Sequence, residues 1–394
     1  MKTVAVFFGG QSAEHDVSII TALTSVIAPL ELAKNYTVIP VYIAKDGRWY
    51  VHEKLKDIAT YQNGAVQDKL SRVKSTGVIC GNGMKLLIPS GFGKRKEITV
   101  DIAFPAMHGT HGEDGELMGM FELAGIPYVG CGVAASAVAM DKVLAKKVAS
   151  AEGILTPRGI YTDSVLITKN PAATKTMCKG LHYPLFVKPA HLGSSIGVSR
   201  VKNEKELTNA LEVAAHYDPT VIVEEAVPNL VEVTLPIMGP HANPQPAVLE
   251  QPLTRNEDFF DFERKYMHGG KKGGKLGTKA GGKPSVKGSQ GYSHIPANLP
   301  KDLFDAAVQT GLGVYRALGC DGIARVDMLV DTKAKKVYFN EVNPLPGSLY
   351  AHNWQQAGVS RVELVEKLIT FALARHAEKA THTTTFTTNF LKQF

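Results

Sequence analysis

Two strand-like runs near the C-terminus carry polar side chains that could hold a metal ion. Alternate residues of a strand face the same way, so Arg325 and Asp327 share one face of GIARVDMLV, and Glu341 and Asn343 share one face of VYFNEVNP. If these strands pair, two carboxylates, an amide and an arginine meet on one surface. Such oxygen ligands suit Mg²⁺, and Arg325 would neutralise an anionic reaction centre. The residues alone leave open a solvated sheet face with a salt bridge.

A loop of small residues follows the apolar run Leu185–Pro189. Lys188 lies near the end of that run, and Gly193-Ser194-Ser195-Ile196-Gly197 comes shortly after it. Small residues leave backbone N–H groups free to approach phosphate oxygens, and the lysine adds a point charge. The order differs from a Walker A loop, because the lysine precedes the glycines. Alone, such a Gly-Ser-Ser turn is more often only a turn.

Polar residues also follow strands nearer the N-terminus. Glu14 comes soon after Gly9-Gly10, while Met107-His108-Gly109 and Gly112-Glu113-Asp114-Gly115 follow a second apolar run. Ligands of α/β sheets sit outside the carboxyl ends of the strands, so these groups are candidates for a binding site. A lone histidine in such a place is more often a structural hydrogen-bonding group than a catalyst.

The run Val221–Val227 (VIVEEAV) carries acids on a strand, and Glu232 lies close behind it. Its acids and backbone could hold an adenine and a ribose through hydrogen bonds. The alternative is an ordinary edge strand.

The N-terminal part of the chain alternates between strands and helices. A strand over Thr3–Phe8 is followed by a helical pattern over Val17–Ile27 and a second strand over Thr37–Ala44, and Asp46-Gly47 is typical of a hairpin turn. This alternation predicts a parallel sheet covered by helices.

Later elements are predicted from the same signals. A strand pair is expected around Pro228-Asn229, formed by Val221–Val227 and Val231–Met238. The other predicted strands are Ile98–Pro105, Leu185–Pro189, Ile196–Val201, Gly322–Asp331 and Lys336–Asn343. The predicted helices are Glu116–Ala124, Val133–Glu152, Asn203–His216, Lys301–Leu318 and Arg361–His376.

The bulk composition bounds the class of protein. A chain of 394 residues with 44% apolar and 21% charged residues suits two or three globular domains. The longest uncharged stretch, Leu123 to Met140, is interrupted by Pro127 and several glycines, and we expect no membrane span there. The four cysteines lie far apart, which argues against a zinc site or a disulfide framework. We therefore expect a cytoplasmic protein with reduced thiols.

The net charge of +7 comes from one segment. Arg264 to Lys287 carries eight positive charges and no acid, so the rest of the chain is near neutral. A nucleic-acid-binding protein is therefore one hypothesis. Tyr266 is the single aromatic residue in this run, so partners for base stacking are scarce.

Taken together and in order, these pieces resemble the D-alanine–D-alanine ligases of the ATP-grasp superfamily. The resemblance covers about Val4 to Leu373. It rests on GGQSAEHDVS, HGTHGEDGELMGMFELAGIPYVGCGVAASAVAMDK, FVKPAHLGSSIGVSRV, FFDFERKY, GIARVDMLVD and NEVNPLPGS.

The resemblance implies an α/β fold of three domains, with ATP held between the last two. The N-terminal parallel-sheet domain would span 1–130, the central ATP-grasp subdomain 131–224 and the C-terminal subdomain 225–380, followed by a tail, 381–394. A Gly/Lys-rich lid loop would span 264–295.

The resemblance also implies roles for single residues. The ATP phosphates would be bound by Lys142, Lys188 and Lys265, with Ser194 and Ser195 closing over the γ-phosphate. The rest of the nucleotide site would comprise Glu224, Glu225, Val227, Glu232, Phe259 and Asn340. Asp327, Glu341 and Asn343 would hold two Mg²⁺ ions, for which Mn²⁺ is a possible substitute.

For the substrates, the resemblance assigns the first D-alanine's ammonium to Glu14 and its carboxylate to the neighbourhood of His108. Arg325 and Gly347 would steady the oxyanion, and Tyr266 with Glu14 and Ser194 would close the site. Tyrosine at position 266 goes with an amine acceptor in the family, so the expected product is a peptide, D-alanyl-D-alanine, for peptidoglycan synthesis.

Three departures from the family pattern affect this reading. The lid is longer than usual, and Met118 replaces a glutamine. After Pro346-Gly347 the usual Thr-x-x-Ser-Leu is absent, and Ser348 and His352 stand in the region that holds the acceptor's carboxylate.

The altered region leaves the acceptor open: D-serine, D-lactate or another small amine is the alternative. An inactive ATP-grasp scaffold is a further hypothesis, against which the intact acids and lysines of the site argue. The expected partners are the small-molecule substrates and a second copy of the chain in a homodimer, without nucleic acid or membrane.

Overall fold

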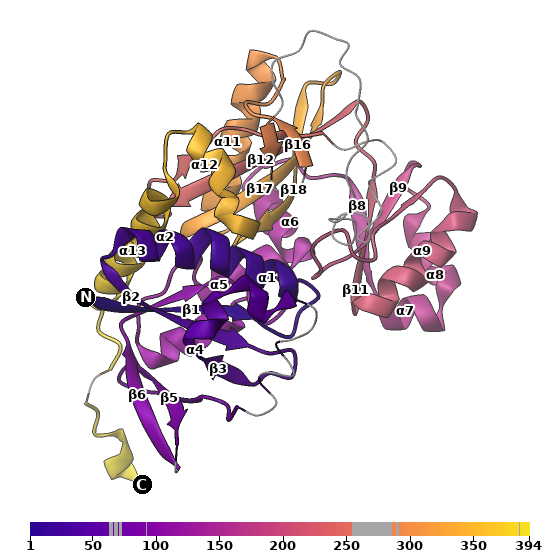
Figure 1. The fold of residues 1–394 in the computed structure, drawn as a ribbon. Coiled ribbons are helices and arrows are strands. Elements are labelled where there is room, and N and C mark those ends of the chain that lie inside the picture. The colour runs from indigo at the N-terminus through magenta and orange to yellow at the C-terminus, as the bar shows by residue number, and fades with distance from the viewer. Residues whose placement is uncertain are drawn as a thin grey trace.

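The computed structural model describes residues 1–62, 66, 70, 73–91, 93–253, 286–288, 291–385 and 387–394. Within these residues the chain forms three four-stranded sheets and two smaller ones, with helices packed against them (Figure 1). The cleft described below lies where loops from the first sheet meet the second and third sheets.

The first sheet has the strand order β3-β2-β1-β7. Strands β1 (Lys2–Gly9), β2 (Tyr36–Ile43) and β7 (Ile102–Pro105) are parallel, and the short β3 (Trp49–Val51) returns antiparallel to β2. The predicted parallel sheet and hairpin are confirmed. Residues on both faces of β1 are buried, which is why the strand is a continuous apolar run.

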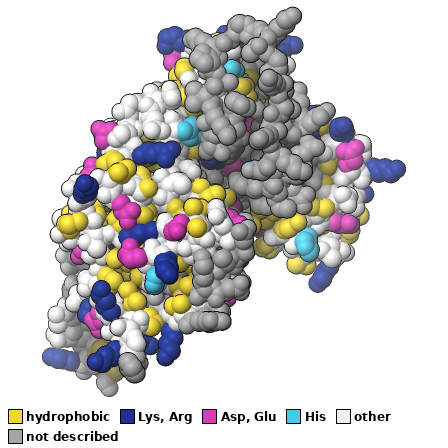
Figure 2. Space-filling model, viewed as in Figure 1, with side chains coloured by type: hydrophobic (Ala, Val, Ile, Leu, Met, Phe, Trp, Pro, Cys, Tyr) yellow, Lys and Arg dark blue, Asp and Glu magenta, His cyan; other side chains and the backbone are white. Residues whose placement is uncertain are grey.

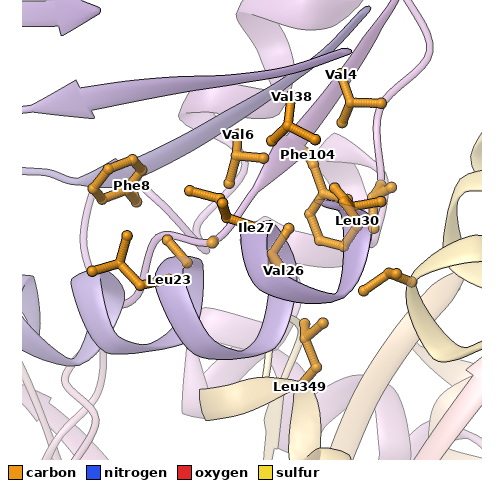
Figure 3. Packing of buried hydrophobic residues seen from close by; sticks show 14 of the residues in the cluster. Val4, Val6, Phe8, Leu23, Val26, Ile27, Leu30, Val38, Phe104 and Leu349 are labelled. Carbon is orange, nitrogen blue, oxygen red and sulfur yellow. The ribbon is translucent and has the colours of Figure 1, made fainter. Parts of the chain in front are cut away.

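A long helical segment covers one face of this sheet. It comprises α1 (His15–Thr21), a π-helical turn (Ala22–Ile27) and α2 (Ala28–Ala33). Figure 3 shows Leu23, Val26 and Leu30 of this segment packed toward the β1 side chains. Among the described residues, His15–Ala33 is long and apolar enough to be a candidate membrane span by composition alone. Its apolar character is accounted for by its packing into this core.

Residues 98–105 do not form the single strand that the sequence predicts. The chain instead breaks at Asp101, where the carboxylate accepts the Thr3 N–H at 2.7 Å. Strand β6 (Lys94–Val100) belongs to a small antiparallel sheet with β4 (Gly77–Cys80) and β5 (Met84–Ser90), and β7 joins the first sheet.

Helix α4 (Glu116–Ala124) ends at Gly125 as expected, with a positive φ of 67° at that glycine.

The predicted helix over Val133–Glu152 is two helices, α5 (Val133–Met140) and α6 (Lys142–Ala151). Asp141 breaks the run with extended backbone, and its carboxylate caps α6 by accepting the N–H groups of Val143 and Leu144. Both helices pack on the third sheet, and Val143 of α6 also packs in a small cluster with Ile222 of the second sheet.

The second sheet is antiparallel and has the order β10-β9-β11-β8. Its strands are β8 (Gly159–Asp163), β9 (Leu185–Pro189), β10 (Ser199–Val201) and β11 (Thr220–Glu225). Its helices are α7 (Ser164–Lys169), α8 (Pro171–Cys178) and α9 (Glu204–Tyr217). Asn203, the first residue of the predicted helix, caps α9 by accepting the Glu206 N–H at 3.1 Å.

The third sheet has the order β13-β12-β17-β18, and helix α11 (Lys301–Ala317) packs on it. Its strands are β12 (Leu230–Gly239), β13 (Gln245–Pro246), β17 (Gly322–Asp331) and β18 (Lys336–Asn343). The predicted pairing of the two strands around Pro228-Asn229 is wrong. Strand β11 pairs with β8 and β9, whereas β12 pairs with β13 and β17, so the link between them crosses from one sheet to the next.

The last α-helix of the described residues returns to the first sheet. After the short α12 (Ala351–Gln356), helix α13 (Arg361–Lys379) packs beside α2 (Figure 1). Its buried Leu364, Leu368 and Ile369 belong to the same hydrophobic core as β1. A small sheet of β14 (Gln251–Pro252), β15 (Val286–Gly288) and β16 (Gly291–His294) lies beside the third sheet. The predicted domain boundaries stay predictions.

Candidate active site

One cleft gathers most of the residues that the sequence singles out. It is lined by the loops after β1 and β7, by the second sheet and by the third sheet. Every predicted site residue that the structure describes lines this cleft, apart from His352. Phe259, Lys265, Tyr266 and most of the predicted lid lie outside the described residues.

The acid-bearing strands pair as predicted. In the β17–β18 register Asp327 is opposite Glu341 and Arg325 is opposite Asn343, with an irregularity in the pairing after Asp327. Arg325 grips Asp327 with two hydrogen bonds, Nε to Oδ1 at 2.8 Å and Nη2 to Oδ2 at 2.5 Å. Asn343 Nδ2 also donates to Asp327 Oδ2, at 3.2 Å. The groups therefore meet on one surface. The Thr234 hydroxyl also donates a hydrogen bond to the Asp327 carboxylate, as Arg325 and Asn343 do.

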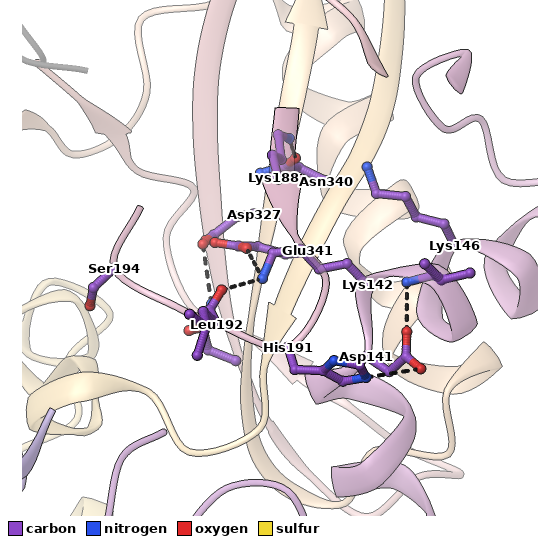
Figure 4. Close-up of polar contacts among 12 residues, drawn as sticks. Asp141, Lys142, Lys146, Lys188, His191, Leu192, Ser194, Asp327, Asn340 and Glu341 are labelled. Carbon is purple, nitrogen blue, oxygen red and sulfur yellow. Dashed lines mark hydrogen bonds and ion pairs between the residues drawn. The ribbon is translucent and has the colours of Figure 1, made fainter. Parts of the chain in front are cut away.

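Glu341 faces the same cleft and is held ionised by its neighbours. Its carboxylate lies 3.2 Å from Lys142 Nζ. Burial opposes ionisation, but the positive charges of Lys142 and Arg325 outweigh it and lower the pKa of Glu341. Figure 4 shows Asp327 and Glu341 close together. Two carboxylates and an amide on one strand pair are an oxygen donor set that fits Mg²⁺.

A buried cluster of two lysines and one acid lies beside this set. Glu224 is only 3% exposed and binds Lys188 Nζ at 2.9 Å and the ammonium of Lys146. Lys188 also donates to Asn340 Oδ1 at 3.1 Å. The sequence reading missed Lys146, although its spacing of four residues from Lys142 places both on one face of α6.

The pKa values of this cluster follow from burial and charge. Burial works against the Glu224 carboxylate, but Lys146 and Lys188 lower its pKa to about 2. Burial lowers the pKa of Lys146 to about 8, partly offset by Glu224. The cluster thus carries more positive than negative charge while its own acid stays ionised.

The small-residue loop after β9 has unusual backbone geometry. Ser194, Ser195 and Gly197 all have positive φ, at 53°, 60° and 69°. For the serines this left-handed conformation costs free energy, and such strain is concentrated at binding sites. The Ser194 hydroxyl bonds to Glu14 from the loop after β1, so two members of the predicted closing set meet.

The end of the cleft nearest the first sheet holds His108 and Glu113. His108 Nε2 lies 2.7 Å from Thr21 Oγ1, and the Thr21 hydroxyl accepts the Ser348 N–H at 2.9 Å. Burial lowers the pKa of His108 to about 4, so the ring is neutral at pH 7. Glu113, which belongs to one of the candidate binding groups in the sequence, accepts the Leu345 N–H at 3.3 Å and ties this loop to the one that carries Gly347.

Two protein-family models match the chain. A family model described as "D-ala D-ala ligase N-terminus" matches residues 3–131, and one described as "D-ala D-ala ligase C-terminus" matches residues 160–370. The chain belongs to the D-alanine–D-alanine ligase family.

Relatives within the D-alanine–D-alanine ligase family match nearly end to end. A curated D-alanine–D-alanine ligase of Chlorobium chlorochromatii is 37% identical, covering 94% of this chain and 98% of its own. One of Acetivibrio thermocellus is 36% identical, covering 95% and 96%. Among solved structures, the VanG D-Ala:D-Ser ligase of Enterococcus faecalis has 30% identity and a TM-score of 0.74, covering 94% of this chain and 99% of its own. The D-alanine–D-alanine ligase of Coxiella burnetii has 27% identity and the same TM-score, covering 97% and 98%. The predicted ATP-grasp fold is confirmed.

The region that departs from the D-alanine–D-alanine ligase pattern has a distinct structure. Ser348, Leu349 and Tyr350 are consecutive left-handed residues, with φ of 52°, 51° and 52°. This turn brings Tyr350 into the cleft, with its ring centroid 5.1 Å from Arg325 Cζ. The sequence reading missed Tyr350, because the turn follows no helix or strand period.

In the part of the chain that the structure describes, His352 is not one of the residues that line the cleft. Its Nε2 lies 2.8 Å from the carboxylate of Glu250, which is 1% exposed, and its ring packs on Tyr350 with centroids 4.8 Å apart. Asn353 also donates to Glu250, at 3.2 Å. The histidine that stands in the place of the family's serine is therefore engaged by a buried acid.

Proposed function

We propose that the protein is an ATP-dependent D-alanine–D-alanine ligase that makes D-alanyl-D-alanine for peptidoglycan synthesis. The family assignment supports this activity. The observation that links this activity to particular residues is the cleft. It brings together the Asp327–Glu341 pair, the Lys188–Glu224 pair and the Glu14–Ser194 contact.

The proposed reaction has two steps. A carboxylate oxygen of the first D-alanine attacks the γ-phosphorus of ATP, which gives D-alanyl phosphate and ADP. The amine of the second D-alanine, having lost a proton, attacks the acyl carbon. The tetrahedral intermediate then expels phosphate and leaves the peptide. Positioning and charge neutralisation carry most of the rate in such reactions.

The phosphate end of the site would be formed by residues from three elements. Asp327, Glu341 and Asn343 would hold two Mg²⁺ ions, which would neutralise phosphate oxygens when bound. Lys142 and Lys188 would bind the phosphates, and Ser194 and Ser195 would close over the γ-phosphate. Glu225, Val227 and Glu232, which also line the cleft, support a place there for adenine and ribose.

The amino-acid end of the site would be formed around Glu14. Its carboxylate would hold the ammonium of the first D-alanine, while neutral His108 would lie near the carboxylate. Arg325 and the Gly347 backbone would steady the oxyanion. Burial would lower the pKa of Arg325, but Asp327 and Tyr350 raise it well above its ordinary value. Arg325 therefore keeps the positive charge that this role needs.

A different acceptor is the second candidate, and one observation favours it. Glu250 already occupies His352 Nε2, so this histidine cannot offer that nitrogen to an acceptor carboxylate without losing a buried partner. Of the alternatives, D-serine and D-lactate carry the same carboxylate as D-alanine, so this contact favours only another small amine that lacks one. Phosphate release from ATP, Mg²⁺ and D-alanine alone, with mass spectrometry of the product, decides between them. Turnover only with another acceptor would remove D-alanyl-D-alanine as the product.

We propose a cytoplasmic location, because the reaction draws on ATP and supplies a precursor of the cell wall. A homodimer follows from the family resemblance, and sedimentation analysis tests it. On the described part of the face in Figure 2, positive side chains are scattered among acidic ones. On the described part of this face, the distribution gives the nucleic-acid hypothesis no support.

A further inference from the structure

His191 lies between two carboxylates that belong to different parts of the fold. Its Nδ1 is 2.9 Å from Asp218 Oδ1, and its backbone N–H donates to Asp218 Oδ2 at 2.7 Å. Its Nε2 is 3.4 Å from Asp141 Oδ2. Figure 4 shows the imidazole ring directed at the Asp141 carboxylate. The His191 side chain thus connects Asp218, in the turn before β11, to Asp141, the N-cap residue of α6.

The neighbours of His191 hold Lys142, which would bind phosphate. Ala190 accepts the Lys142 backbone N–H at 3.1 Å, and the Leu192 carbonyl accepts from Lys142 Nζ at 2.7 Å. The same Nζ lies 3.2 Å from Glu341. His191 is therefore the middle residue of a three-residue segment whose outer members position this lysine.

The segment is also the base of the left-handed loop. Ser194 and Ser195 follow His191 within four residues, and their strained backbone needs a fixed starting point. Asp218 supplies a rigid anchor, because it is buried and also accepts the Thr220 N–H at 2.8 Å. Asp141 is equally fixed, because it caps α6.

Bridging both carboxylates requires a ring that donates from both nitrogens. A neutral imidazole has a single N–H, whereas an imidazolium has two. The hydrogen bond to Asp218 raises the pKa of His191, burial opposes it, and Asp141 adds to the rise. The carboxylates of Asp218 and Asp141 face the ring, and both favour its charged form.

We propose that His191 is a positioning residue, whose doubly donating ring clamps the base of the Ser194–Ser195 loop to α6 and so orders this loop and Lys142 for binding the phosphates of ATP. The proposal rests on the proposed function only in taking ATP as the ligand. The clamp is complete at low pH and opens as the pH rises through the raised pKa of the histidine.

Two substitutions at His191 separate charge from shape. His191→Arg keeps a positive charge at every pH in reach of both carboxylates, and His191→Asn keeps one donor without charge. The full-length enzyme is assayed from pH 6 to pH 9 for kcat and for the KM of ATP, with Mg²⁺ and D-alanine present. The pKa of Lys146 is about 8, so loss of its charge contributes the same change to the pH profile of every variant.

The wild type is expected to bind ATP more weakly as the pH rises. In His191→Arg the part of this dependence due to the histidine disappears and the KM stays low. In His191→Asn the KM is about five-fold higher at pH 6, which corresponds to an ion pair worth about 1 kcal/mol. The change is in KM for ATP, with kcat less affected. A His191→Asn profile that superimposes on the wild type overturns the proposal.

A second variant keeps the test decisive if His191→Asn fails to fold. Asp141→Asn preserves a good helix cap while removing one partner's charge, so ATP binding should weaken at a lower pH than in the wild type. Retained wild-type dependence in Asp141→Asn counts against the clamp.

Calorimetric binding of a non-hydrolysable ATP analogue with Mg²⁺ separates the two proposals. If D-alanine gives no turnover but analogue affinity follows the expected pH pattern, D-alanyl-D-alanine falls as the product and the clamp stands. If D-alanine is ligated and analogue affinity ignores His191, the clamp falls alone.

Discussion

Glu224 is a nearly unexposed carboxylate that two lysines contact, and its surroundings decide its charge. A buried ion pair repays its desolvation only when its hydrogen bonds are complete, and here both carboxylate oxygens have a lysine partner. Because the pKa of Glu224 lies near 2 in the folded protein, below its ordinary 4.5, its contribution to stability is present above about pH 4.5. That contribution is lost as the pH falls from 4.5 towards 2.

Removing Lys146 should leave Glu224 with one partner. Lys146→Met is expected to lower the free energy of unfolding by about 2 kcal/mol, less than the ~3–5 kcal/mol for a buried charge left without any partner. Urea unfolding measures the loss. Lys147→Met, an exposed change one residue along α6, is the matched control and should cost under about 1 kcal/mol. Equal effects of the two would contradict the buried cluster.

Glu341 is the acid on which the proposed metal site depends most. Glu341→Gln keeps the size of the side chain and removes its charge, so ADP formation should fall at least about 100-fold, because a preorganised charge in such a site is worth several kcal/mol. A coupled ADP assay measures it. Glu212→Gln on the exposed side of α9 is the control and should leave the rate unchanged. Near-normal turnover in Glu341→Gln would remove the metal assignment.

At the scale of elements, the sequence predicts best where one local period decides. The β17–β18 pairing follows from alternation along each strand, and it places Asp327 opposite Glu341. The break at Asp141 was missed, because a capping aspartate inside an apolar helical run gives little signal without its partners. The wrong β11–β12 pairing has a similar cause, since short links favour hairpins and only the packing of two sheets excludes one here.

Site residues divide in the same way. Strand acids and the lysine of LFVKP carry local signals, whereas Glu250 and Tyr350 matter through contacts with residues far away in the chain. Glu250 meets His352 across a separation of 102 residues. Nothing near Glu250 in the sequence indicates that partner, so only the fold reveals it.

Helix α13 begins with a capping box. The Ser360 hydroxyl accepts the Glu363 N–H at 3.2 Å, and the Glu363 carboxylate accepts the Ser360 N–H at 2.8 Å. Ser360→Ala should therefore destabilise the protein by about 1 kcal/mol. Thermal and urea unfolding measure this, with Thr370→Ala, in the exposed middle of the helix, expected within about 0.5 kcal/mol of the wild type. A neutral Ser360→Ala would show that the cap adds nothing to the folded state.

At the scale of the whole molecule, the two ends of the chain share one core. Deleting residues 361–394 removes side chains buried against the first sheet and should give an insoluble or unfolded product. Deleting only 382–394 removes mostly exposed residues and should leave the melting temperature and the rate unchanged. Solubility, circular dichroism and the ligase assay compare the two truncations. A folded, active 1–360 fragment would contradict the shared core.

The return of α13 also sets an order of events during synthesis. The first sheet and its helical cover leave the ribosome early, but the helix that completes their core is made more than 300 residues after Ala33. At about 5–20 residues per second this delay is on the order of tens of seconds. Throughout that time the nascent chain presents the uncovered apolar face, and that face is where a chaperone would bind it.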